Sequence, residues 1–511
     1  MPLKTELRIE QKSGIIVIAL TVKGITTSRG RGVVMAFYGR ARELALLDQM
    51  HTKSGARMFL LYGRRRVGKT ELLKHWVQTR KYPTLYWQAE LFPSKIQLGQ
   101  FSQVIQQYRF PGQVAAQDFT FGTWEQAFLE IGQLARTSRL VVVLDEFTYA
   151  LAQEPALAST LQKVWDHHLK ETQVVLILSG SHAGMIARSA LAYRSPLYGR
   201  ATHALHLQPL PFGLMHKFLP LSSPEERLTY YGMLDGIPSY LELLDDGAPM
   251  EQNIQRLLES HLIVEDAQKL LRDQFTEIVN YFSVVRAIAA GFTQMAEIGA
   301  MAAVLSNSIG PYLKVLQDLG IVVREVPATE SHPESSKRGR YRIRDHYLRF
   351  YFRFISDQNM SNISLGLYHT VVANIQQHLA EFIGTYTFEE VAREWMARMG
   401  DAGKLPFMPT RVGSFWGPHL PQIDVVATNE DEHAILLGEC KWTAEPIDKA
   451  VVTNHLARAA KVIPDPVDRW KVYHIFFSKS GFTLEARKAA APFKSFWVDL
   501  KQLENDLRAM S

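Results

Sequence analysis

The chain has 511 residues, of which 47% are hydrophobic and 21% are charged, and its formal net charge is +6. This describes an ordinary globular protein of about three domains, because single cores rarely exceed ~250 residues. The mild positive charge permits nucleic acid as a partner without requiring it. The single cysteine, Cys440, excludes an internal disulfide framework and cysteine-based zinc fingers, and it favours a reducing, cytoplasmic location.

The first 35 residues fit the rest of the sequence poorly. Their longest apolar run, Gly14 to Leu20, is too short to span a bilayer and lacks a convincing cleavage site, so we predict neither a membrane anchor nor a signal peptide. Met35 immediately precedes the first periodic segment. We interpret residues 1–35 as an N-terminal extension that need not belong to the natural protein.

The most specific motif follows a short apolar run, Met58 to Tyr62. Gly63 to Thr70 reads G-x-x-x-x-G-K-T, and a helical pattern comes directly after it. This is the strand–loop–helix context that the motif requires. Glycines let backbone N–H groups close around phosphate oxygens, and a helix start favours the same anion. We expect Lys69 to reach the β- and γ-phosphates of ATP and the Thr70 hydroxyl to ligate Mg²⁺.

The loop is predicted to bind the nucleotide along its whole length. Its residues are Gly63, Arg64, Arg65, Arg66, Val67, Gly68, Lys69 and Thr70. The three consecutive arginines raise the positive field around a phosphate, but we expect their side chains to face neighbouring carboxylates or a partner. The alternative interpretation is a Gly/Lys turn without a ligand. The apolar strand before the motif and the helical pattern after it favour nucleotide binding.

An acidic pair ends a continuous apolar run further along the chain. Leu140 to Leu144 is typical of a fully buried parallel strand, and Asp145 and Glu146 follow it. Parallel sheets bind ligands at this end of their strands. On a strand neighbouring the phosphate loop, we expect Asp145 to hold Mg²⁺ through water and Glu146 to activate the attacking water. The alternative is a strand that simply ends in an acidic turn.

A second buried strand is predicted over Val174 to Ser181, and its terminal serines can contact the γ-phosphate. We assign this role to Ser179, with a helix cap or a core hydroxyl as the alternative. Arg200 lies in a polar loop before a further strand, Ala204 to Leu207. Its guanidinium can neutralise charge in the transition state, or it can form a surface ion pair.

Strands and helices alternate through residues 36–215, which predicts an α/β fold with a doubly wound parallel sheet. Pro83 to Ala89 is expected to be its second strand, and Trp124 to Leu134 is expected to be a helix. Further helices follow, so we predict that residues 216–270 form a helical lid on this core.

Residues 271–355 have the pattern of a winged helix-turn-helix. Three short helices are predicted before a hairpin whose first strand is Ile321 to Val326. The wing carries five cations, Lys337, Arg338, Arg340, Arg342 and Arg344. Such a cluster can neutralise phosphates and make DNA binding salt-dependent, although the third helix offers little for reading bases. The alternative is a protein-binding or lid module with a solvated basic loop.

The composition changes again in residues 356–511. Two apolar segments, Gln422 to Ala427 and Ala434 to Trp442, flank a turn and predict an antiparallel hairpin. Side chains alternate along a strand, so Glu439 and Lys441 share one face, which Asp424 on the neighbouring strand can meet.

These two carboxylates repel each other unless a cation joins them. A hard divalent metal such as Mg²⁺ takes oxygen ligands of this kind, and Lys441 could then orient water or stabilise a charged phosphate. Glu389 or Glu390, from the preceding helix, could add a further carboxylate. Without a metal, the alternative is a cross-strand salt bridge between Lys441 and Asp424.

The motifs together resemble those of the archaeal-type P-loop ATPases of the AAA/STAND group. They are Gly63 to Thr70, the acidic strand end at Glu146, LSGS at Leu178 to Ser181, SPLYGR at Ser195 to Arg200, and GRYRIRD at Gly339 to Asp345. The C-terminal third resembles the domain that often follows such ATPases, with a PD-(D/E)XK nuclease-like, restriction-endonuclease-like α/β core.

The resemblance covers nearly the whole chain from Phe37, and it implies roles for individual residues. Lys69 and Thr70 would bind ATP–Mg²⁺, and Asp145 and Glu146 would serve hydrolysis. The implied nuclease-type site comprises Asp424, Glu439 and Lys441, with Glu389 as the helical carboxylate because it follows Phe388 in an FE pattern. In STAND-like members, ATP binding is thought to act as a switch.

We therefore predict an ATP-hydrolysing protein that acts on DNA and carries a Mg²⁺-dependent nuclease-like domain. The alternative is a non-cleaving, ATP-dependent regulator that binds DNA or protein through the winged helix and the C-terminal domain. ATP and DNA are the expected partners, a homo-oligomer is one possible assembly, and no membrane partner is expected because the sequence has no spanning segment.

Overall fold

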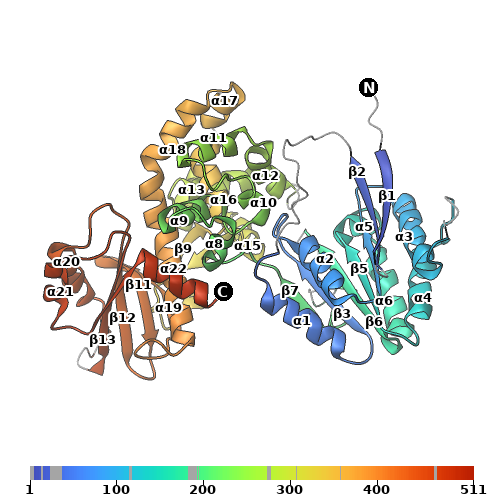
Figure 1. Cartoon of the computed structure of the whole chain (residues 1–511). Coiled ribbons are helices and arrows are strands. Elements are labelled where there is room, and N and C mark those ends of the chain that lie inside the picture. Colours follow the sequence, from blue (N-terminus) through green and yellow to red (C-terminus); the bar gives the residue numbers. More distant parts are fainter. Residues whose placement is uncertain are drawn as a thin grey trace. The chain divides into compact units, whose positions relative to one another are not determined.

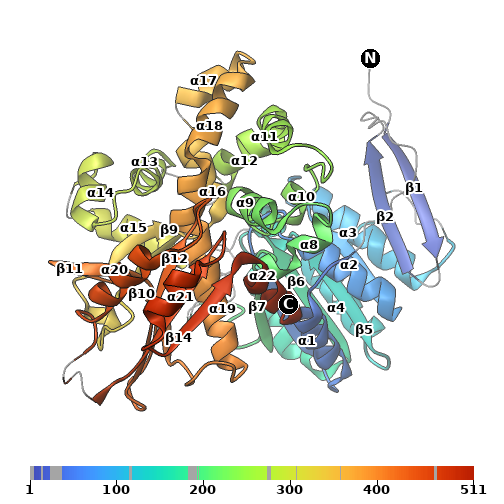
Figure 2. The ribbon, with the colours of Figure 1, turned by 60° about the vertical axis from the view of Figure 1, so that its left-hand side comes forward.

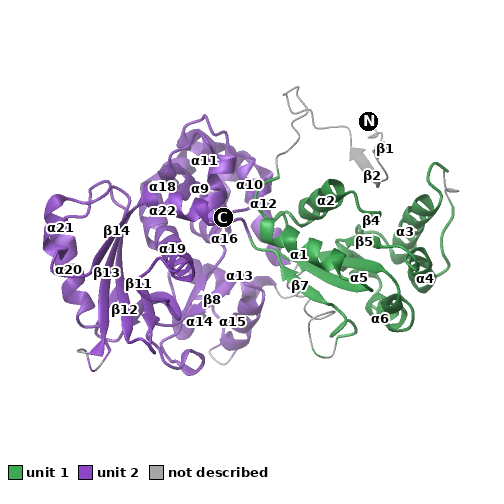
Figure 3. Ribbon diagram, turned by 60° about the horizontal axis from the view of Figure 1, so that its bottom comes forward, with its two compact units in different colours: residues 1–208 green, residues 209–511 purple. Residues whose placement is uncertain are grey.

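The chain forms two compact units, residues 1–208 and 209–511 (Figure 3). The computed structural model describes residues 5–12, 15–22, 37–113, 118–181, 193, 195–272, 275, 278–305, 308–356, 358–464, 466 and 469–511. Within these ranges, no helix combines the length and the apolar character that crossing a bilayer requires.

The first unit contains a five-stranded parallel sheet, which confirms the predicted α/β core (Figure 1). Its strands are β3 (Arg57–Tyr62), β4 (Thr84–Gln88), β5 (Leu140–Asp145), β6 (Val174–Gly180) and β7 (His203–His206). The helices are α1 (Ala41–Thr52), α2 (Lys69–Arg80), α3 (Ser94–Arg109), α4 (Trp124–Leu134), α5 (Phe147–Gln153) and α6 (Leu157–His167). Near the N-terminus, β1 (Thr5–Lys12) and β2 (Ile15–Val22) pair as an antiparallel hairpin.

The strand order of this sheet is β4-β5-β6-β3-β7. Every residue of β5 and β6 is buried, which explains why both read as continuous apolar runs. Side chains of β3, β4, β5 and β6 share one apolar core with α3, α4 and α6. The expectation that the acidic strand neighbours the phosphate-loop strand was wrong, because β6 lies between β3 and β5. The end of β6 therefore falls between the loop and the acidic pair.

The second unit begins with helices that continue into a small antiparallel hairpin. The helices are α8 (Met215–Phe218), α9 (Pro224–Leu234), α10 (Pro238–Leu241), α11 (Met250–Glu259), α12 (His261–Arg272), α13 (Ile278–Ala289), α14 (Met295–Met301) and α15 (Ile309–Asp318). The hairpin pairs β8 (Val322–Glu325) with β9 (Arg340–Ile343). Next come α16 (His346–Phe350), α17 (Gln358–Ser364) and α18 (Tyr368–Phe382), and α18 packs beside α11 (Figure 2).

The helical segment after the sheet belongs to the second unit, which begins at Pro209. A buried ion pair contributes to this arrangement. Arg227 on α9 donates two hydrogen bonds, of 2.5 and 2.7 Å, to the carboxylate of Glu504 on the C-terminal helix α22 (Leu500–Ala509). The first and last parts of this unit are therefore joined directly.

The C-terminal part of the second unit is a five-stranded mixed sheet flanked by helices. The strands lie in the order β10 (Arg411–Gly417), β11 (Leu420–Asn429), β12 (Ala434–Lys441), β13 (Lys471–Ser478) and β14 (Ser495–Asp499). The flanking helices are α19 (Glu389–Asp401), α20 (Lys449–Ala459), α21 (Leu484–Ala490) and α22. The antiparallel register of β11 and β12 pairs Val425 with Gly438, which confirms the predicted hairpin.

Candidate functional site

The phosphate loop connects β3 to α2, and its two glycines have backbone requirements that other residues do not meet. Gly63 has φ 156°, and a Cβ there would lie 2.5 Å from the carbonyl oxygen of Leu207. Gly68 has φ 98° and immediately precedes the first helical residue, Lys69. Substitution at either position would strain the backbone, because side chains disfavour this region. The sequence motif is thus explained by local geometry.

Lys69 is buried inside the loop and connects it to the ends of two other strands. Its Nζ donates to the carbonyl oxygens of Gly63 and Arg64, both at 3.1 Å, and to Ser181 Oγ at 2.9 Å. The Glu146 carboxylate lies 4.0 Å away. Burial lowers the pKa of Lys69, and the carboxylates of Glu146 and Asp145 oppose that effect.

Asp145 at the end of β5 accepts three hydrogen bonds from neutral donors. Thr70 Oγ1 and Tyr86 Oη each donate to Oδ2 at 2.7 Å, and the Glu146 amide donates to Oδ1 at 3.0 Å. The Thr70 hydroxyl and the Asp145 carboxylate therefore lie side by side, and they are the hard oxygen donors that Mg²⁺ prefers. This donor chemistry fits the predicted role of the two residues.

Glu146 adopts a left-handed conformation, with φ 50°, which is uncommon for a residue with a side chain. This conformation turns its carboxylate toward the end of β6. There it accepts hydrogen bonds from the Ser181 amide at 3.1 Å and from Ser181 Oγ at 2.5 Å. The predicted base is thus held by the same serine that contacts Lys69.

The remaining predicted residues of this site differ in what they contact. Arg65 donates to the Tyr149 hydroxyl at 2.7 Å. Ser179 Oγ is buried and has no hydrogen-bond partner among the described residues. Arg200 forms a two-point ion pair with Asp166, at 2.6 and 2.9 Å, as its surface-pair alternative predicts. A catalytic role for Arg200 would require that pair to open.

Sequence reasoning did not assign roles to Ser181, Tyr86 or Arg40 at this site. Ser181 was visible only as one of two serines at a strand end, and its contacts depend on the position of β6 between β3 and β5. Tyr86 carries no motif, and only the alignment of β4 with β5 brings it to Asp145. Arg40 donates to the carbonyl oxygen of Val67 at 3.0 Å and so supports the loop from outside.

The carboxylates of the C-terminal sheet form a second cluster, in which cations surround one member. Glu439 on β12 is buried and contacts Lys441 at 2.7 Å, Arg458 at 2.5 Å and His455 at 3.4 Å. Burial alone would raise the pKa of Glu439, but His455 and Lys441 outweigh it and lower this pKa to about 2. The predicted alternative of a Lys441–Asp424 bridge is wrong, because Lys441 pairs with Glu439.

The other two carboxylates have fewer cations near them. Asp424 on β11 accepts a hydrogen bond from the Cys440 amide at 3.0 Å, and its pKa is raised by burial and by Glu439. Burial and the charge of Asp424 raise the pKa of Glu389 to about 8, although Arg393 lies 3.5 Å from it. Both carboxyl groups therefore keep their protons to a higher pH than exposed carboxyls do.

 The carboxylate of Glu390, the neighbour of Glu389 on α19, contacts Arg342 at 2.6 Å, Arg349 at 3.0 Å and His346 at 3.0 Å. Burial would raise the pKa of Glu390, but these neighbours hold it well below its usual range. Glu390 is therefore a structural ion-pair centre, which leaves Glu389 as the helical carboxylate that faces Asp424.

The predicted metal set of Glu389, Asp424 and Glu439 is not assembled in this structure. Across the described ranges, no group of three or more His, Cys, Asp or Glu side chains is arranged to hold a metal ion. The physical reason is that Lys441, Arg458 and His455 draw Glu439 to themselves. Oxygen ligands are present, but binding a cation here would require Glu439 to exchange partners.

Three of the five cations predicted to form a basic wing are already engaged. Arg338 pairs with Glu330 at 2.6 Å, and Arg342 pairs with Glu325 at 2.5 Å as well as with Glu390. The Arg340 guanidinium lies 4.8 Å from the centre of the Trp416 ring. Lys337 and Arg344 are exposed. The cationic surface is therefore smaller than the sequence suggested.

Similarity to known proteins shows the family of this chain. Residues 37–244 match an ATPase domain found predominantly in Archaea, and residues 351–454 match a family of archaeal and bacterial proteins of unknown function. An uncharacterized protein of Methanocaldococcus jannaschii is 31% identical over 446 residues, which cover 87% of this chain and 95% of the relative. The chain belongs to this archaeal-type ATPase family.

The archaeal-type ATPase also has similar solved structures. A Walker-type ATPase of Pyrococcus abyssi is 21% identical, with a TM-score of 0.47, and the match covers 62% of this chain and 96% of that one. Cdc6p of Pyrobaculum aerophilum is 12% identical, with a TM-score of 0.31, and covers 66% of this chain and 94% of its own. Both TM-scores are below 0.5, so neither likeness supports an argument about function.

Proposed function

We propose that the first unit binds and hydrolyses ATP with Mg²⁺. The observation that carries this proposal is the convergence of five side chains from the start of α2 and the ends of β5 and β6: Lys69, Thr70, Asp145, Glu146 and Ser181. Lys69 would bind the β- and γ-phosphates, and Thr70 and Asp145 would hold the metal. Mg²⁺, when bound, would neutralise charge on the triphosphate.

Glu146 would act as the general base of this reaction. A carboxylate can accept a proton from the attacking water while the water oxygen bonds to the γ-phosphorus, the bond from that phosphorus to the β,γ-bridging oxygen breaks, and ADP leaves. In this structure both Glu146 oxygens accept hydrogen bonds from Ser181. Each carboxylate oxygen has a second lone pair that can accept from the water, so Ser181 would position Glu146 while the water binds.

Nucleotide binding and hydrolysis can be tested separately. Glu146→Gln should keep the affinity for ATP measured by calorimetry, because the amide is similar in shape, but it should abolish phosphate release. Glu171→Gln, at an exposed position of the same unit, is the matched control. If the wild-type protein releases no phosphate from ATP in the presence of Mg²⁺, the proposal of hydrolysis is wrong.

We propose metal-dependent cleavage of DNA as a second function, carried by a nuclease-like domain in residues 356–511. The paired carboxylates Glu389 and Asp424, with Lys441 nearby, support it, because a divalent cation would relieve their repulsion. Asp424→Asn should abolish cleavage of plasmid, single-stranded or branched DNA with Mg²⁺ or Mn²⁺. Asp431→Asn, at an exposed turn of the same sheet, should not.

We also propose that α13, α14, α15 and the β8–β9 hairpin act as a winged helix-turn-helix that contacts DNA. Because the other wing cations are engaged, Lys337 and Arg344 would make the phosphate contacts. Replacing both with alanine should lower the salt dependence of DNA binding by roughly one unit of slope per lost contact. Lys404→Ala, at another exposed position, should leave the slope unchanged.

A non-cleaving, ATP-dependent switch is the rival to the nuclease proposal. The ion pairs of Glu439 favour this rival, because they occupy one of the expected metal ligands. ATP hydrolysis without cleavage of any DNA form, with either metal, would support the switch and would contradict the nuclease.

A further inference from the structure

Tyr86 occupies a place in the nucleotide site that no sequence motif assigns. It lies on β4, where residues 84–88 align with residues 141–145 of β5. The side chain reaches across to the end of β5, and its hydroxyl donates to Asp145 Oδ2 at 2.7 Å. Tyr86 therefore touches the residue that would hold Mg²⁺, while it comes from a different strand.

The hydrogen bonds around Asp145 fix its carboxylate at both oxygens. Oδ2 accepts from Thr70 and Tyr86, and Oδ1 accepts from the Glu146 amide. Thr70 lies in the first turn of α2, directly after the phosphate loop, and the Glu146 amide belongs to the residue next to Asp145. Tyr86 is the donor that is anchored in the middle of a strand, so it fixes the carboxylate independently of the phosphate loop.

The Tyr86 hydroxyl also suits this role, because a phenol is a neutral donor and Asp145 offers it a carboxylate acceptor. A hydrogen bond from a neutral donor to a buried carboxylate is stronger than one between neutral groups. Groups that orient a metal ligand in this way commonly change metal affinity when they are lost.

We propose that Tyr86 is a positioning residue, which holds the Asp145 carboxylate in the orientation that Mg²⁺-nucleotide requires. This inference rests on the proposed ATP site. It predicts that loss of the hydroxyl lowers the affinity for Mg²⁺ but not the affinity for the nucleotide without Mg²⁺. The reason is that the Tyr86 hydroxyl donates to Asp145, which would hold the metal.

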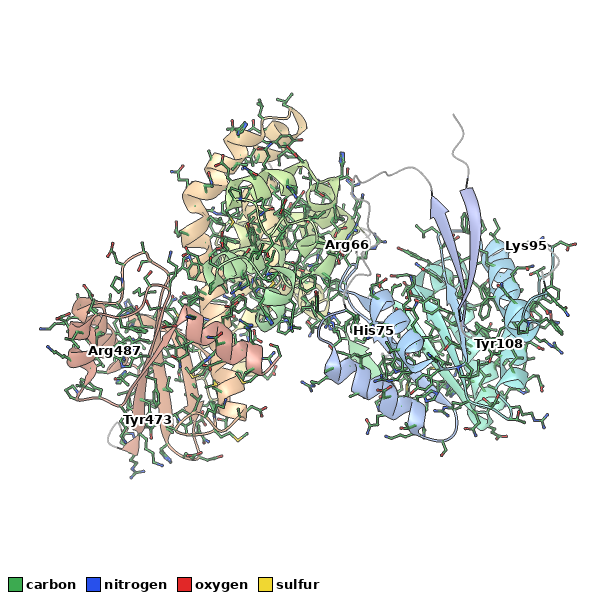
Figure 4. All side chains as sticks on the ribbon, in the orientation of Figure 1. Arg66, His75, Lys95, Tyr108, Tyr473 and Arg487 are labelled. Carbon is green, nitrogen blue, oxygen red and sulfur yellow. The ribbon has the colours of Figure 1, made fainter. Side chains whose placement is uncertain are left out.

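The test is Tyr86→Phe, which removes the hydroxyl and keeps the ring. Calorimetry with the non-hydrolysable analogue AMPPNP, at increasing MgCl₂, should show a roughly tenfold higher half-saturating Mg²⁺ concentration than in the wild type. Binding of AMPPNP in EDTA should be unchanged. Tyr108→Phe, on α3 of the same unit (Figure 4), is the control and should behave as the wild type.

A double-mutant cycle gives a second measurement. In an Asp145→Asn background, Tyr86→Phe should cause little further change in the Mg²⁺ dependence, because its partner is already altered. An unchanged half-saturating Mg²⁺ concentration in Tyr86→Phe, or an equal loss of affinity with and without Mg²⁺, would overturn the inference. Failure of the wild type to bind AMPPNP would instead overturn the proposed ATP site, so the two failures are distinguishable.

Discussion

The two candidate sites satisfy their carboxylates in opposite ways. At the end of the parallel sheet, Asp145 and Glu146 accept hydrogen bonds from hydroxyls and amides, and Lys69 lies 4.0 Å from Glu146. In the mixed sheet, Glu439 is held by Lys441 and Arg458, while Glu389 and Asp424 repel each other. Hydrogen bonds from neutral donors leave the negative charge of a carboxylate without a counter-charge, so it can still attract a metal ion. An ion pair already supplies that counter-charge.

This difference affects how much each site would have to rearrange to bind its proposed ligands. The proposed ATP site would bind a phosphate and a cation by exchanging a few hydrogen bonds. The second must first break an ion pair of a buried carboxylate, and charged partners are costly to separate in a buried environment. The following experiments, from the largest expected effect to the smallest, test this contrast.

Lys69→Ala should have the largest effect. It removes a cation that the loop buries, and loss of such an electrostatic contact typically costs about 100- to 1,000-fold in rate. Phosphate release at saturating Mg²⁺ is the measurement. Lys74→Ala, on the outer part of the same helix, is the control, and equal rates in wild type and Lys69→Ala would contradict the site.

Arg227→Ala should destabilise the second unit strongly, because it leaves the buried carboxylate of Glu504 without its partner. Removing one member of a buried pair costs about 3–5 kcal/mol. Urea unfolding measures the loss. Arg256→Ala breaks an exposed pair with Asp245, at 3.4 Å, and should cost less than about 1 kcal/mol. Similar losses in the two variants would show that burial does not decide the difference.

The pH dependence of the second unit should report the repulsion between Glu389 and Asp424. Burial and the charge of Asp424 raise the pKa of Glu389 in the folded protein from its ordinary 4.5 to about 8, so the native state binds this proton more tightly than the unfolded state does. Stability should therefore fall as pH rises from about 4.5 to 8, by roughly 2–4 kcal/mol.

Glu389→Gln should remove that loss, because the amide does not ionise. The free energy of unfolding of this variant, measured by urea at pH 5 and pH 8, should change less than that of the wild type. Glu381→Gln, at an exposed position on α18, should keep the wild-type pH dependence. A wild-type stability that does not fall over this range would show that the two carboxylates are not coupled.

Arg458→Gln should have the smallest effect. It removes one of the cations that hold Glu439 and so lowers the cost of exchanging that carboxylate to a metal. We expect the affinity for Mn²⁺, measured by calorimetry, to rise several-fold. Arg487→Gln, on α21 of the same part of the unit, is the control. A lower Mn²⁺ affinity in Arg458→Gln would indicate that the arginine assists cation binding instead.

The parts of the fold that depend on local pattern were predictable. Every residue of β5 and β6 is buried, so their composition had to be apolar throughout, and α4 begins and ends where its periodicity indicates. The order of the strands was not predictable, because several strands are equally apolar and their sequences do not show which of them pair with each other. For the same reason the contacts of Ser181 and Tyr86 could not be inferred from their positions in the sequence.

The sequence by itself determined the phosphate loop, because Gly63, Gly68, Lys69 and Thr70 act within one short segment whose backbone needs those residues. It also determined that acidic residues end a buried strand. Only the tertiary structure decided that Glu439 pairs with Lys441 and Arg458, and that the wing arginines are engaged within the chain. The partner of a charged side chain often comes from a distant segment of the chain. The sequence alone therefore cannot show which two charges will form an ion pair.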